Sequence, residues 1–295
     1  MKGLQIGELS VHRVEESCGP AIAASEFLVG LPDDAIEAQR DWLVPSAYDP
    51  ASGNLVLSMH SWIVKTRHHT VLIDSCMGNG KTRSLPMMHM LDTPWLSRLA
   101  DRGVRPEQVD FVMCTHLHAD HVGWNTRLRD GRWVPTFPNA RYLFSRREFN
   151  HWDPRTGGAG GMGMEGVFED SILPCVEAGQ VTLVDDGYAV DDALVVEAAP
   201  GHTEGNSIIR ARSAGSSGLF TGDCLHTPLQ IAYPHVNSVA CEDHAQATKT
   251  RRRILEECTE RGHLMLPAHF PPPHVGQIAR SGDGFRYRPL AGVTF

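Results

Sequence analysis

The residues Thr115–Asn125, which read THLHADHVGWN, are the most informative stretch of this sequence. Four side chains that commonly bind metal ions are crowded together in it: His116, His118, Asp120 and His121. They follow the segment 110–114 (DFVMC), which is typical of a short buried strand. Because His116 and His118 are two residues apart, extended backbone would project them to the same side. One ion does not readily take four ligands from so short a segment, so the spacing favours two neighbouring ions.

Three further candidate ligands follow other predicted strands. His202 comes after ALVVEAA, Asp223 after GLFTG and His269 after LMLPA. A small or rigid residue (glycine, proline or alanine) stands beside each of them. This repeated pattern predicts polar side chains gathered along one edge of a sheet.

The composition limits the class of protein. The chain has 295 residues, of which 41% are hydrophobic and 21% charged, as in an ordinary globular protein. A formal net charge of −8 and the lack of a long basic run argue against nucleic acid or an anionic membrane as a partner. No apolar run approaches the length of about eighteen residues that predicts a membrane span. The 16 histidines stand out, since histidine is the commonest metal ligand.

The N-terminal segment and the cysteines indicate the compartment. The segment MKGLQIGELSVHRVE alternates polar and apolar residues and lacks the apolar core of a signal peptide, so we expect a cytoplasmic protein. The seven cysteines are scattered without a CxxC pair, which favours free thiols over a disulfide framework.

The order of the predicted elements favours a single α/β domain over 1–295. Strand patterns occupy 4–15, 55–74, 110–114, 140–145, 181–198, 206–212, 218–222 and 264–268, and helical patterns occupy 86–102 and 242–261. Two runs of strands thus carry helices, and no Pro/Gly-rich linker separates them. The segment 153–166 is rich in glycine and methionine, which fits either a surface loop or a mobile lid. We therefore expect a possible lid loop at 150–176.

The seven candidate ligands resemble the metallo-β-lactamase superfamily. Its HxHxDH motif and its later His, Asp and His are all filled here in order, and the resemblance covers nearly the whole chain. It implies a four-layer αββα sandwich. It also implies one ion held by His116, His118 and His202, and a second held by Asp120, His121 and His269. Asp223 would bridge the two ions. Zinc is the expected ion, and Mn, Fe or Co suit the same ligands.

The resemblance implies hydrolysis by attack of a metal-bound hydroxide. Two divalent ions lower the pKa of a shared water toward neutrality, and the hydroxide can attack a carbonyl or phosphoryl centre. A carboxylate beside the reacting water can accept or deliver a proton, which is the role expected for Asp120. The expected catalytic residues are Asp120, Asp223 and His226.

Within the superfamily, the chain resembles the lactonase and methyl parathion hydrolase-like branch. The run from Gly222 to His226 and the stretch THLHADHVGWN carry this resemblance. Asp223 argues against the true β-lactamases with this motif, which lack a bridging aspartate. His118 argues against flavodiiron proteins, which have glutamate there. The short segment after His269 and the lack of an added basic domain favour neither glyoxalase II nor the RNA-processing members.

Two departures concern the substrate. The acyl-homoserine lactonases have a tyrosine where this chain has His226, and a histidine where it has Asn206. For His226 three interpretations stay open: a hydrogen bond to the substrate, orientation of Asp223, or an ordinary loop position. Asp74 ends a predicted strand at the same edge and is a candidate to orient a metal-bound histidine.

Other side chains have two interpretations each. Several apolar residues could line a substrate pocket or simply pack in the core: Trp124, Phe149, Trp152 and Met162. Phe270 and the prolines after it could shape the site or fix the exit of the chain. The basic residues at 249–253 fit a solvated helix face better than an anion site.

The sequence therefore predicts a dinuclear hydrolase that opens a lactone or cleaves a small carboxylic ester. The first alternative is a phosphotriester hydrolase of the methyl parathion hydrolase type. The second is a metal-binding protein without catalysis. The expected partner is a small-molecule substrate, and the family resemblance makes a homodimer possible.

Overall fold

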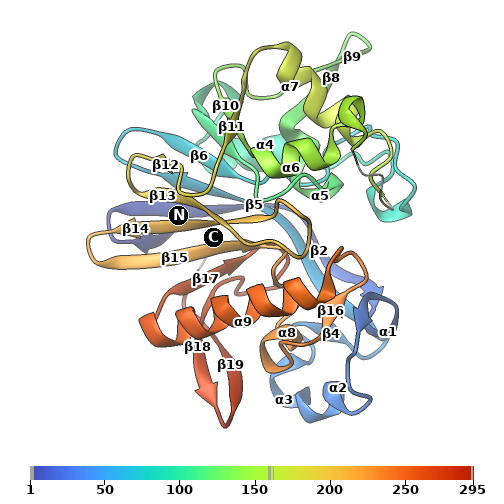
Figure 1. Cartoon of the computed structure of the whole chain (residues 1–295), viewed down its shortest axis with the longest axis vertical. Coiled ribbons are helices and arrows are strands. Elements are labelled where there is room, and N and C mark those ends of the chain that lie inside the picture. Colours follow the sequence, from blue (N-terminus) through green and yellow to red (C-terminus); the bar gives the residue numbers. More distant parts are fainter. Residues whose placement is uncertain (1–2, 159–160, 162, 294) are drawn as a thin grey trace.

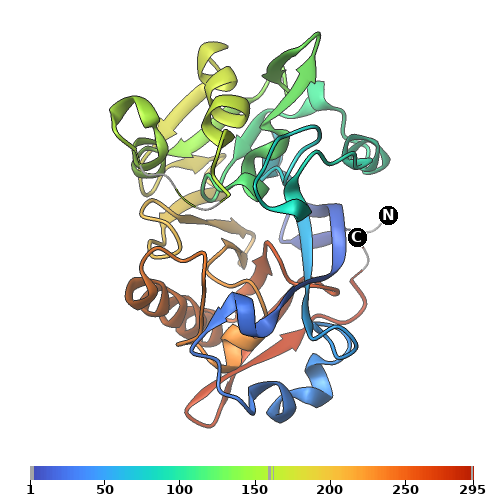
Figure 2. The same cartoon turned by 90° about the vertical axis from the view of Figure 1, so that its right-hand side faces the viewer.

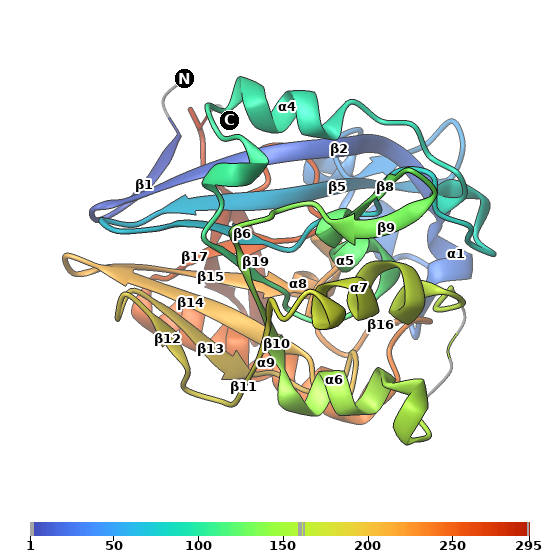
Figure 3. The same ribbon diagram turned by 90° about the horizontal axis from the view of Figure 1, so that it is seen from above.

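Two β-sheets pack face to face, with helices on their outer surfaces (Figure 1). A computed structural model describes residues 3–158, 161, 163–293 and 295. Figure 3 looks across the layers, with α4 (Trp95–Asp101) outside one sheet and α9 (His244–Arg261) outside the other. This architecture confirms the predicted αββα sandwich.

The first sheet comes from the N-terminal part of the chain. Its strands in spatial order are β1 (Leu4–Ile6), β2 (Leu9–Ala23), β5 (Asn54–Lys65), β6 (Thr70–Ile73), β7 (Phe111–Met113), β10 (Arg141–Ser145) and β11 (Val181–Val184), with β4 (Tyr48–Asp49) paired to β5. Strands β1, β2, β5 and β6 pair antiparallel, whereas β6, β7, β10 and β11 are parallel. Near one end of the sheet lie two more short strands, β8 (Thr126–Arg129) and β9 (Arg132–Pro135), which form a ribbon.

The second sheet comes from the C-terminal part of the chain. Its strands in spatial order are β12 (Ala189–Val190), β13 (Leu194–Ala198), β14 (Ser207–Ser213), β15 (Ser216–Gly222), β17 (Leu264–Pro267), β18 (Gly276–Ser281) and β19 (Gly284–Pro289). Among its described strands, only β15 and β17 pair in parallel, with α9 between them in the chain. A two-stranded pair of β3 (Leu28–Val29) and β16 (Asn237–Ser238) lies outside both sheets.

The helices are mostly short. Besides α4 and α9 they are α1 (Ala24–Phe27), α2 (Ala35–Ala38), α3 (Arg40–Leu43), α5 (Ala119–Val122), α6 (Arg146–Trp152), α7 (Leu173–Glu177) and α8 (Leu229–Ala232). Single turns of 3₁₀-helix span Pro86–Met88, Pro106–Gln108, Gly123–Asn125 and Pro154–Thr156, and a π-helical turn spans Phe168–Ile172. None of the described helices is both long and apolar enough to cross a bilayer.

Alternation along the strands explains why both faces of each sheet are apolar. On β5, Trp62 and Val64 point into the layer between the sheets, while Ile63 packs beneath the outer helices with Trp95 and Leu99. On the second sheet, Phe220 of β15 points inward, and its neighbour Leu219 packs under α9. These near-continuous apolar runs are what strands buried on both faces require.

The parallel strands place polar residues at one edge. Asp74 follows β6, and His116 lies just beyond β7, its parallel neighbour. In the other sheet Asp223 and His269 follow the parallel neighbours β15 and β17. Because parallel strands end at the same edge of a sheet, these side chains meet between the two sheets.

Some predicted elements were wrong. Residues 4–15 form two strands, because the chain reverses at Gly7, whose φ is 60°. The helix expected at 86–102 is limited to α4 and one separate turn. Between them the side chain of Asn79 binds the backbone of Thr93 on both sides, which holds the chain as a loop before Pro94.

The hairpin of β18 and β19 was not predicted. Its sequence nevertheless alternates, since Ile278, Phe285 and Tyr287 are buried between more exposed neighbours. Gly282, with φ 55°, provides the turn.

Candidate metal centre

All seven predicted ligands converge on one edge of the sandwich. They form two groups in which the ligand atoms lie within 4.8 Å of one another: His116, His118, His202 and Asp223, and Asp120, His121, Asp223 and His269. Asp223 belongs to both groups. The division into groups is the one that the sequence resemblance implied.

Asp223 lies between the two groups and turns one oxygen toward each. Its Oδ2 is 3.2 Å from His202 Nε2 and 3.7 Å from His116 Nε2. Its Oδ1 is 2.9 Å from His269 Nε2 and 3.2 Å from His121 Nε2. The carboxylate can therefore serve both groups at once.

The arrangement of the nitrogens fits metal ions better than it fits hydrogen bonding within the protein. His116 Nε2 is buried and makes no hydrogen bond with any residue that the structure describes. His202 Nε2 faces His118 Nδ1 at 3.0 Å, and His269 Nε2 faces His121 Nε2 at 3.2 Å. Buried polar atoms normally have partners, and a bound ion is one explanation for a group that has none. Nitrogen and oxygen donors of this kind suit zinc and several other divalent ions.

The other ring nitrogen of several ligands is held in place. His121 Nδ1 lies 2.9 Å from Asp74 Oδ2 and donates to it. His116 Nδ1 is 3.1 Å from Thr115 Oγ1, and His269 Nδ1 is 3.3 Å from Ser58 O. Such partners fix the orientation of a metal-binding imidazole. This contact with His121 is the one that the predicted role of Asp74 requires, and the role itself stays a prediction.

His202 has an unusual partner. Its Nδ1 lies 3.6 Å from Cys241 Sγ, and Ser238 Oγ lies 3.4 Å from the same sulfur. Although burial alone raises the pKa of the Cys241 thiol, the contact with His202 lowers it overall. No spacing in the sequence relates Cys241 to His202, so this contact could not be predicted. All seven cysteines lie in the described part of the chain and are free thiols, as expected.

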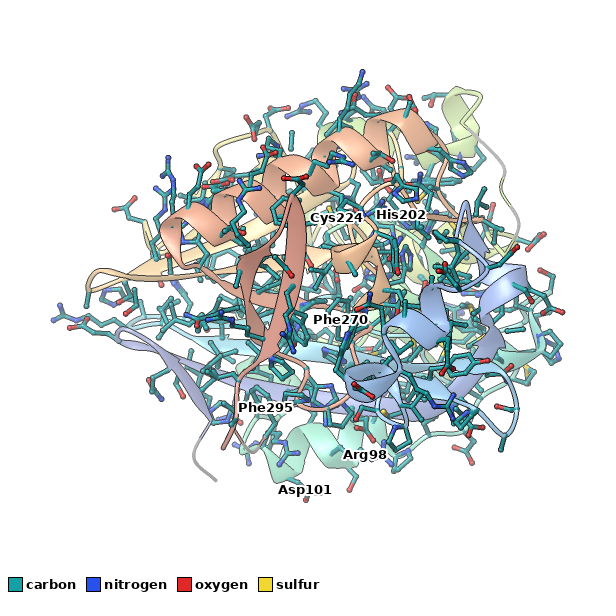
Figure 4. The ribbon with its side chains drawn as sticks, turned by 90° about the horizontal axis from the view of Figure 1, so that it is seen from below. Arg98, Asp101, His202, Cys224, Phe270 and Phe295 are labelled. Carbon is teal, nitrogen blue, oxygen red and sulfur yellow. The ribbon has the colours of Figure 1, made fainter. Side chains whose placement is uncertain are left out.

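Two glycines allow the ligand loops to approach their neighbours. Gly201 has φ 128°, and a Cβ there would lie 2.2 Å from the backbone nitrogen of Ala247 at the start of α9. Gly222 has φ 48°, and its Cβ would lie 2.7 Å from Thr115 Oγ1. Only glycine fits either position without a shift, which explains the small residues beside His202 and Asp223. Figure 4 shows the labelled His202 on the interior side of α9.

The charges of the site shift several pKa values. Although burial alone raises the pKa of Asp223, the surrounding histidines hold it well below its ordinary value. Burial, reinforced by neighbouring histidines, lowers the pKa of His116 and His118 well below the ordinary value. Burial also acts to lower the pKa of His121, but Asp223, Asp74 and Asp120 raise it well above that value. The carboxylates thus favour positive charge at this edge, whether as protons or as metal ions.

His226 lies against Asp223. Its Nε2 is 3.1 Å from Asp223 Oδ2, while its buried Nδ1 has no hydrogen-bond partner in the described part of the chain. The ring stacks on His269 with 5.7 Å between centroids and meets the edge of Phe27. Burial lowers the pKa of His226 to about 4, so the ring is neutral at pH 7. The contact favours orientation of Asp223, and because His226 also lines the cavity beside the ligands, a hydrogen bond to the substrate stays a prediction as well.

Both groups open into one cavity of about 380 Å³. Ligands from both groups line its floor: His118, Asp120, Asp223 and His269. Its walls are mainly apolar and rich in methionine: Ile22, Phe27, Leu57, Met59, Leu85, Met87, Met88, Trp152, Met164 and Val239. Another cavity, of about 450 Å³, lies where the light-blue helices α2 and α3 meet the red hairpin in Figure 2, and no member of either ligand group lines it.

Some of the predicted pocket residues line the cavity, whereas others pack in the core. Trp152 lines the cavity, and its ring centroid lies 5.5 Å from that of His118. Trp124 is buried and stacks on Trp95, and Phe149 packs against Phe168, so these two belong to the core. Met162 lies outside the described residues. Gly161, Gly163 and Met164 bring the predicted lid segment to the cavity wall, whereas its movement stays a prediction.

The structure corrects the expectation for Arg251 and decides between the two interpretations of Phe270. Arg251 is fully buried, although the basic residues of its helix were expected to be solvated. Its guanidinium donates to Cys224 O, Pro234 O and Val236 O, and so holds the loop that follows Asp223. Phe270 is buried against Tyr287 and does not line the cavity. Figure 4 places the labelled Phe270 in the interior.

Glu148 was missed altogether. It is 1% exposed, on α6, and its carboxylate accepts hydrogen bonds from two of the ligand-bearing loops, at Leu117 and Thr203. The sequence around it, SRREF, shows only the start of a helix. No local pattern announces that the side chain is buried.

Comparison with known proteins gives a family and several relatives. The N-acyl homoserine lactonase AttM of Azorhizobium caulinodans is 29% identical over 131 residues, which are 42% of this chain and 44% of that protein. The match thus spans less than half of the length of that lactonase.

Solved structures resemble nearly the whole chain. The hydrolase AbOPH has a TM-score of 0.81 at 22% identity and covers 98% of this chain and 96% of its own. AidC, described as a dizinc quorum-quenching lactonase, has a TM-score of 0.78 at 18% identity, with 99% and 98% covered. At these identities the likeness establishes the fold alone.

The family itself is defined by a sequence match. The model of the metallo-β-lactamase superfamily matches residues 56–269, from β5 to the last predicted ligand. This range contains all seven grouped side chains and most of both sheets. The chain therefore belongs to the metallo-β-lactamase superfamily.

Proposed function

We propose that this protein is a dinuclear metal-dependent hydrolase that opens a lactone or cleaves a small carboxylic ester with an apolar acyl group. The observation that carries the proposal is the position of the two ligand groups on the floor of one apolar cavity. The family membership and the lactonases among the similar proteins support it.

The proposed ligands are those of the two groups. One ion would be held by His116, His118 and His202 and the other by Asp120, His121 and His269, with Asp223 shared. Zinc is the ion we propose. When bound, two such ions would lower the pKa of water and polarise the bond to be cleaved.

The residues of the chain would have distinct tasks. Asp120 lines the cavity and is partly exposed, so its carboxylate can take up a proton close to the substrate. His226 would hold Asp223 through the contact of 3.1 Å. The methionine-rich wall would bind the acyl group and exclude water from the floor of the cavity.

The chemistry of the wall suggests the kind of substrate. A cavity of about 380 Å³ with mainly apolar walls and few polar groups suits a small molecule with one polar, reactive end. A lactone or ester with an aliphatic chain has this character. Apart from the proposed ligands, the described lining includes one carboxylate, that of Glu242, and no lysine or arginine, so an anionic substrate would find no cationic side chain there.

The test is turnover by zinc-loaded protein. Proton release would be followed on lactones of increasing acyl length, on aryl esters and on phosphotriesters, with EDTA-treated protein as the control. We expect zinc-dependent opening of lactones and a KM that falls as the acyl chain lengthens. Turnover of phosphotriesters alone would replace the proposal by its first alternative. No turnover with two ions bound would favour a protein that only binds metal.

A further inference from the structure

Glu148 touches the two loops that carry the histidine ligands of the first group. Its Oε1 accepts hydrogen bonds from Leu117 N at 3.0 Å and from Trp152 Nε1 at 2.7 Å. Its Oε2 accepts from Thr203 Oγ1 at 2.7 Å and from Gly205 N at 3.0 Å. One buried carboxylate thus binds four donors from three parts of the chain.

These contacts are next to the proposed ligands. Leu117 stands between His116 and His118, and Thr203 follows His202 directly. The rings of His118 and His202 are 4.7 Å apart, and their facing nitrogens are 3.0 Å apart. The carboxylate of Glu148 therefore connects the two loops whose separation determines this distance.

The backbone that carries Glu148 is held rigidly. Glu148 lies in the first turn of α6, where its backbone N–H donates to Ser145 Oγ, the N-cap of the helix. The preceding strand, β10, is held on both sides by β7 and β11. Gly205 lies so close that a Cβ there would be 2.1 Å from Glu148 N. Helix and loop are in direct backbone contact, so a shift of the carboxylate would be passed on to the loop.

The second group has different supports. His121 is held by Asp74, and His269 by the carbonyl of Ser58. Among the contacts that the structure describes, Glu148 makes none with these residues. Loss of its carboxylate should therefore affect one group and spare the other.

We propose that Glu148 is a positioning residue that sets the distance between His118 and His202, and with it the affinity of the first group for its ion. The inference rests on the proposed dinuclear centre. It goes further by predicting that one side chain, in contact with neither ion, controls one of the two affinities.

Glu148→Gln changes the fewest atoms. Its amide nitrogen would replace one of the two accepting oxygens. If the amide nitrogen lies beside Thr203, the threonine hydroxyl can turn to accept from it, but the N–H of Gly205 loses its partner. If the amide nitrogen lies beside Leu117, the N–H groups of Leu117 and Trp152 both lose their partner. In either orientation the connection between the loops is weakened on one side.

The chain offers a matched control in Glu16. This residue is 3% exposed, and its carboxylate also accepts from two backbone N–H groups, one threonine and one tryptophan: Met77 N, Gly78 N, Thr93 Oγ1 and Trp124 Nε1. None of these partners is a proposed ligand or flanks one directly. Glu16→Gln therefore imposes the same chemical defect away from the first group.

The experiment is a zinc titration of metal-free protein against a competing chelator. We expect two ions for the natural protein and for Glu16→Gln. For Glu148→Gln we expect one ion with unchanged affinity and one that is at least about tenfold weaker, the effect typical of partners beyond the ligands themselves. The double variant Glu148→Gln/His269→Ala should bind the remaining, tighter ion more weakly than Glu148→Gln does. The double variant Glu148→Gln/His202→Ala should bind zinc as well as His202→Ala alone does.

The outcomes separate the inference from the function on which it rests. If the natural protein binds no zinc, the proposed centre fails. If the natural protein binds two ions and Glu148→Gln binds both equally well, the inference fails alone. Equal weakening in Glu16→Gln would also overturn it, because the effect would then be general loosening. Should Glu148→Gln not fold, Thr203→Val removes one donor and should weaken the same ion to a smaller extent.

Discussion

His121 Nδ1 donates to Asp74 Oδ2 across 2.9 Å, in a buried contact between residues that follow two parallel strands. The other oxygen of Asp74 accepts from the backbone N–H of Thr115 at 2.7 Å. Asp74 has φ 56°, a left-handed conformation that few residues with a side chain adopt. The backbone is thus bent so that one carboxylate serves both the start of the HxHxDH loop and its last histidine.

Asp74→Asn should weaken the binding of an ion by the second ligand group. An amide can present only one accepting oxygen, so either His121 or Thr115 would lose its partner. We expect zinc affinity at the group with Asp120, His121 and His269 to fall about tenfold to a hundredfold. The first group should lose less, because Asp74 reaches it only through Thr115, whose Oγ1 contacts His116 Nδ1. The same chelator titration measures this. Retention of both ions at full affinity would show that Asp74 does not orient His121.

Asp223→Ala should abolish turnover and reduce the number of bound ions below two. The substitution removes both oxygens that face the two groups, at 2.9 Å and 3.2 Å. The fold should survive, because the strands on either side pair through their backbones. Metal analysis and circular dichroism of the purified variant check both statements. Full activity with two ions would contradict the bridging assignment.

His226→Phe should separate orientation from packing. Phenylalanine keeps the stacking on His269 and the contact with Phe27, but it cannot reach Asp223 with a polar atom. We expect kcat to fall by about tenfold or more while two ions remain bound. Unchanged kcat would mean that His226 merely fills space beside the centre.

Acid should destabilise the fold through His274. Burial and the charge of Arg13 lower the pKa of His274 to about 3. The unfolded chain, with an ordinary histidine pKa, then binds more protons, so stability falls as pH drops from about 6.5 toward 3. The buried ring of His60, whose centroid lies 5.2 Å away, has a pKa lowered in the same direction.

His274→Asn isolates this contribution. Asparagine tolerates the left-handed backbone at this position, where φ is 67°, and its amide can still donate to Phe270 O. In urea titrations of EDTA-treated protein between pH 7 and 4, the variant should lose stability less steeply, by up to about 1.4 kcal/mol per pH unit. Parallel curves for the two proteins would rule out a buried neutral His274.

The ligand set could be predicted because its signals are local. His116 to His121 lie in one short run, and His202, Asp223 and His269 each follow an apolar strand beside a small residue. Burial of both sheet faces is likewise visible in the apolar runs. What could not be predicted depends on contacts between distant segments. Glu148 meets Thr203 from 55 residues away, and Cys241 meets His202 from 39.

The burial of Arg251 also depends on a contact between distant segments and could not be predicted. The periodicity of its helix identifies an apolar face but not which loop lies over the helix. The carbonyls of Cys224, Pro234 and Val236 surround the guanidinium, so a residue expected in water is buried, with carbonyls rather than a carboxylate as its partners among the described residues. The unpredicted hairpin β18–β19 differs, since its alternation and glycine turn were present in the sequence.

The membership of the two ligand groups has a consequence for stability. Each group takes two side chains from the segment after β7 and two from the second sheet, so neither part of the chain can complete a group alone. A bound ion would act as a reversible cross-link between the two sheets. At a free concentration one hundred times its Kd, each ion would add about 2.7 kcal/mol to the free energy of unfolding. Chelation should therefore lower the Tm of the whole sandwich in one transition. The Tm of substrate-free protein should likewise rise with the free concentration of metal ion.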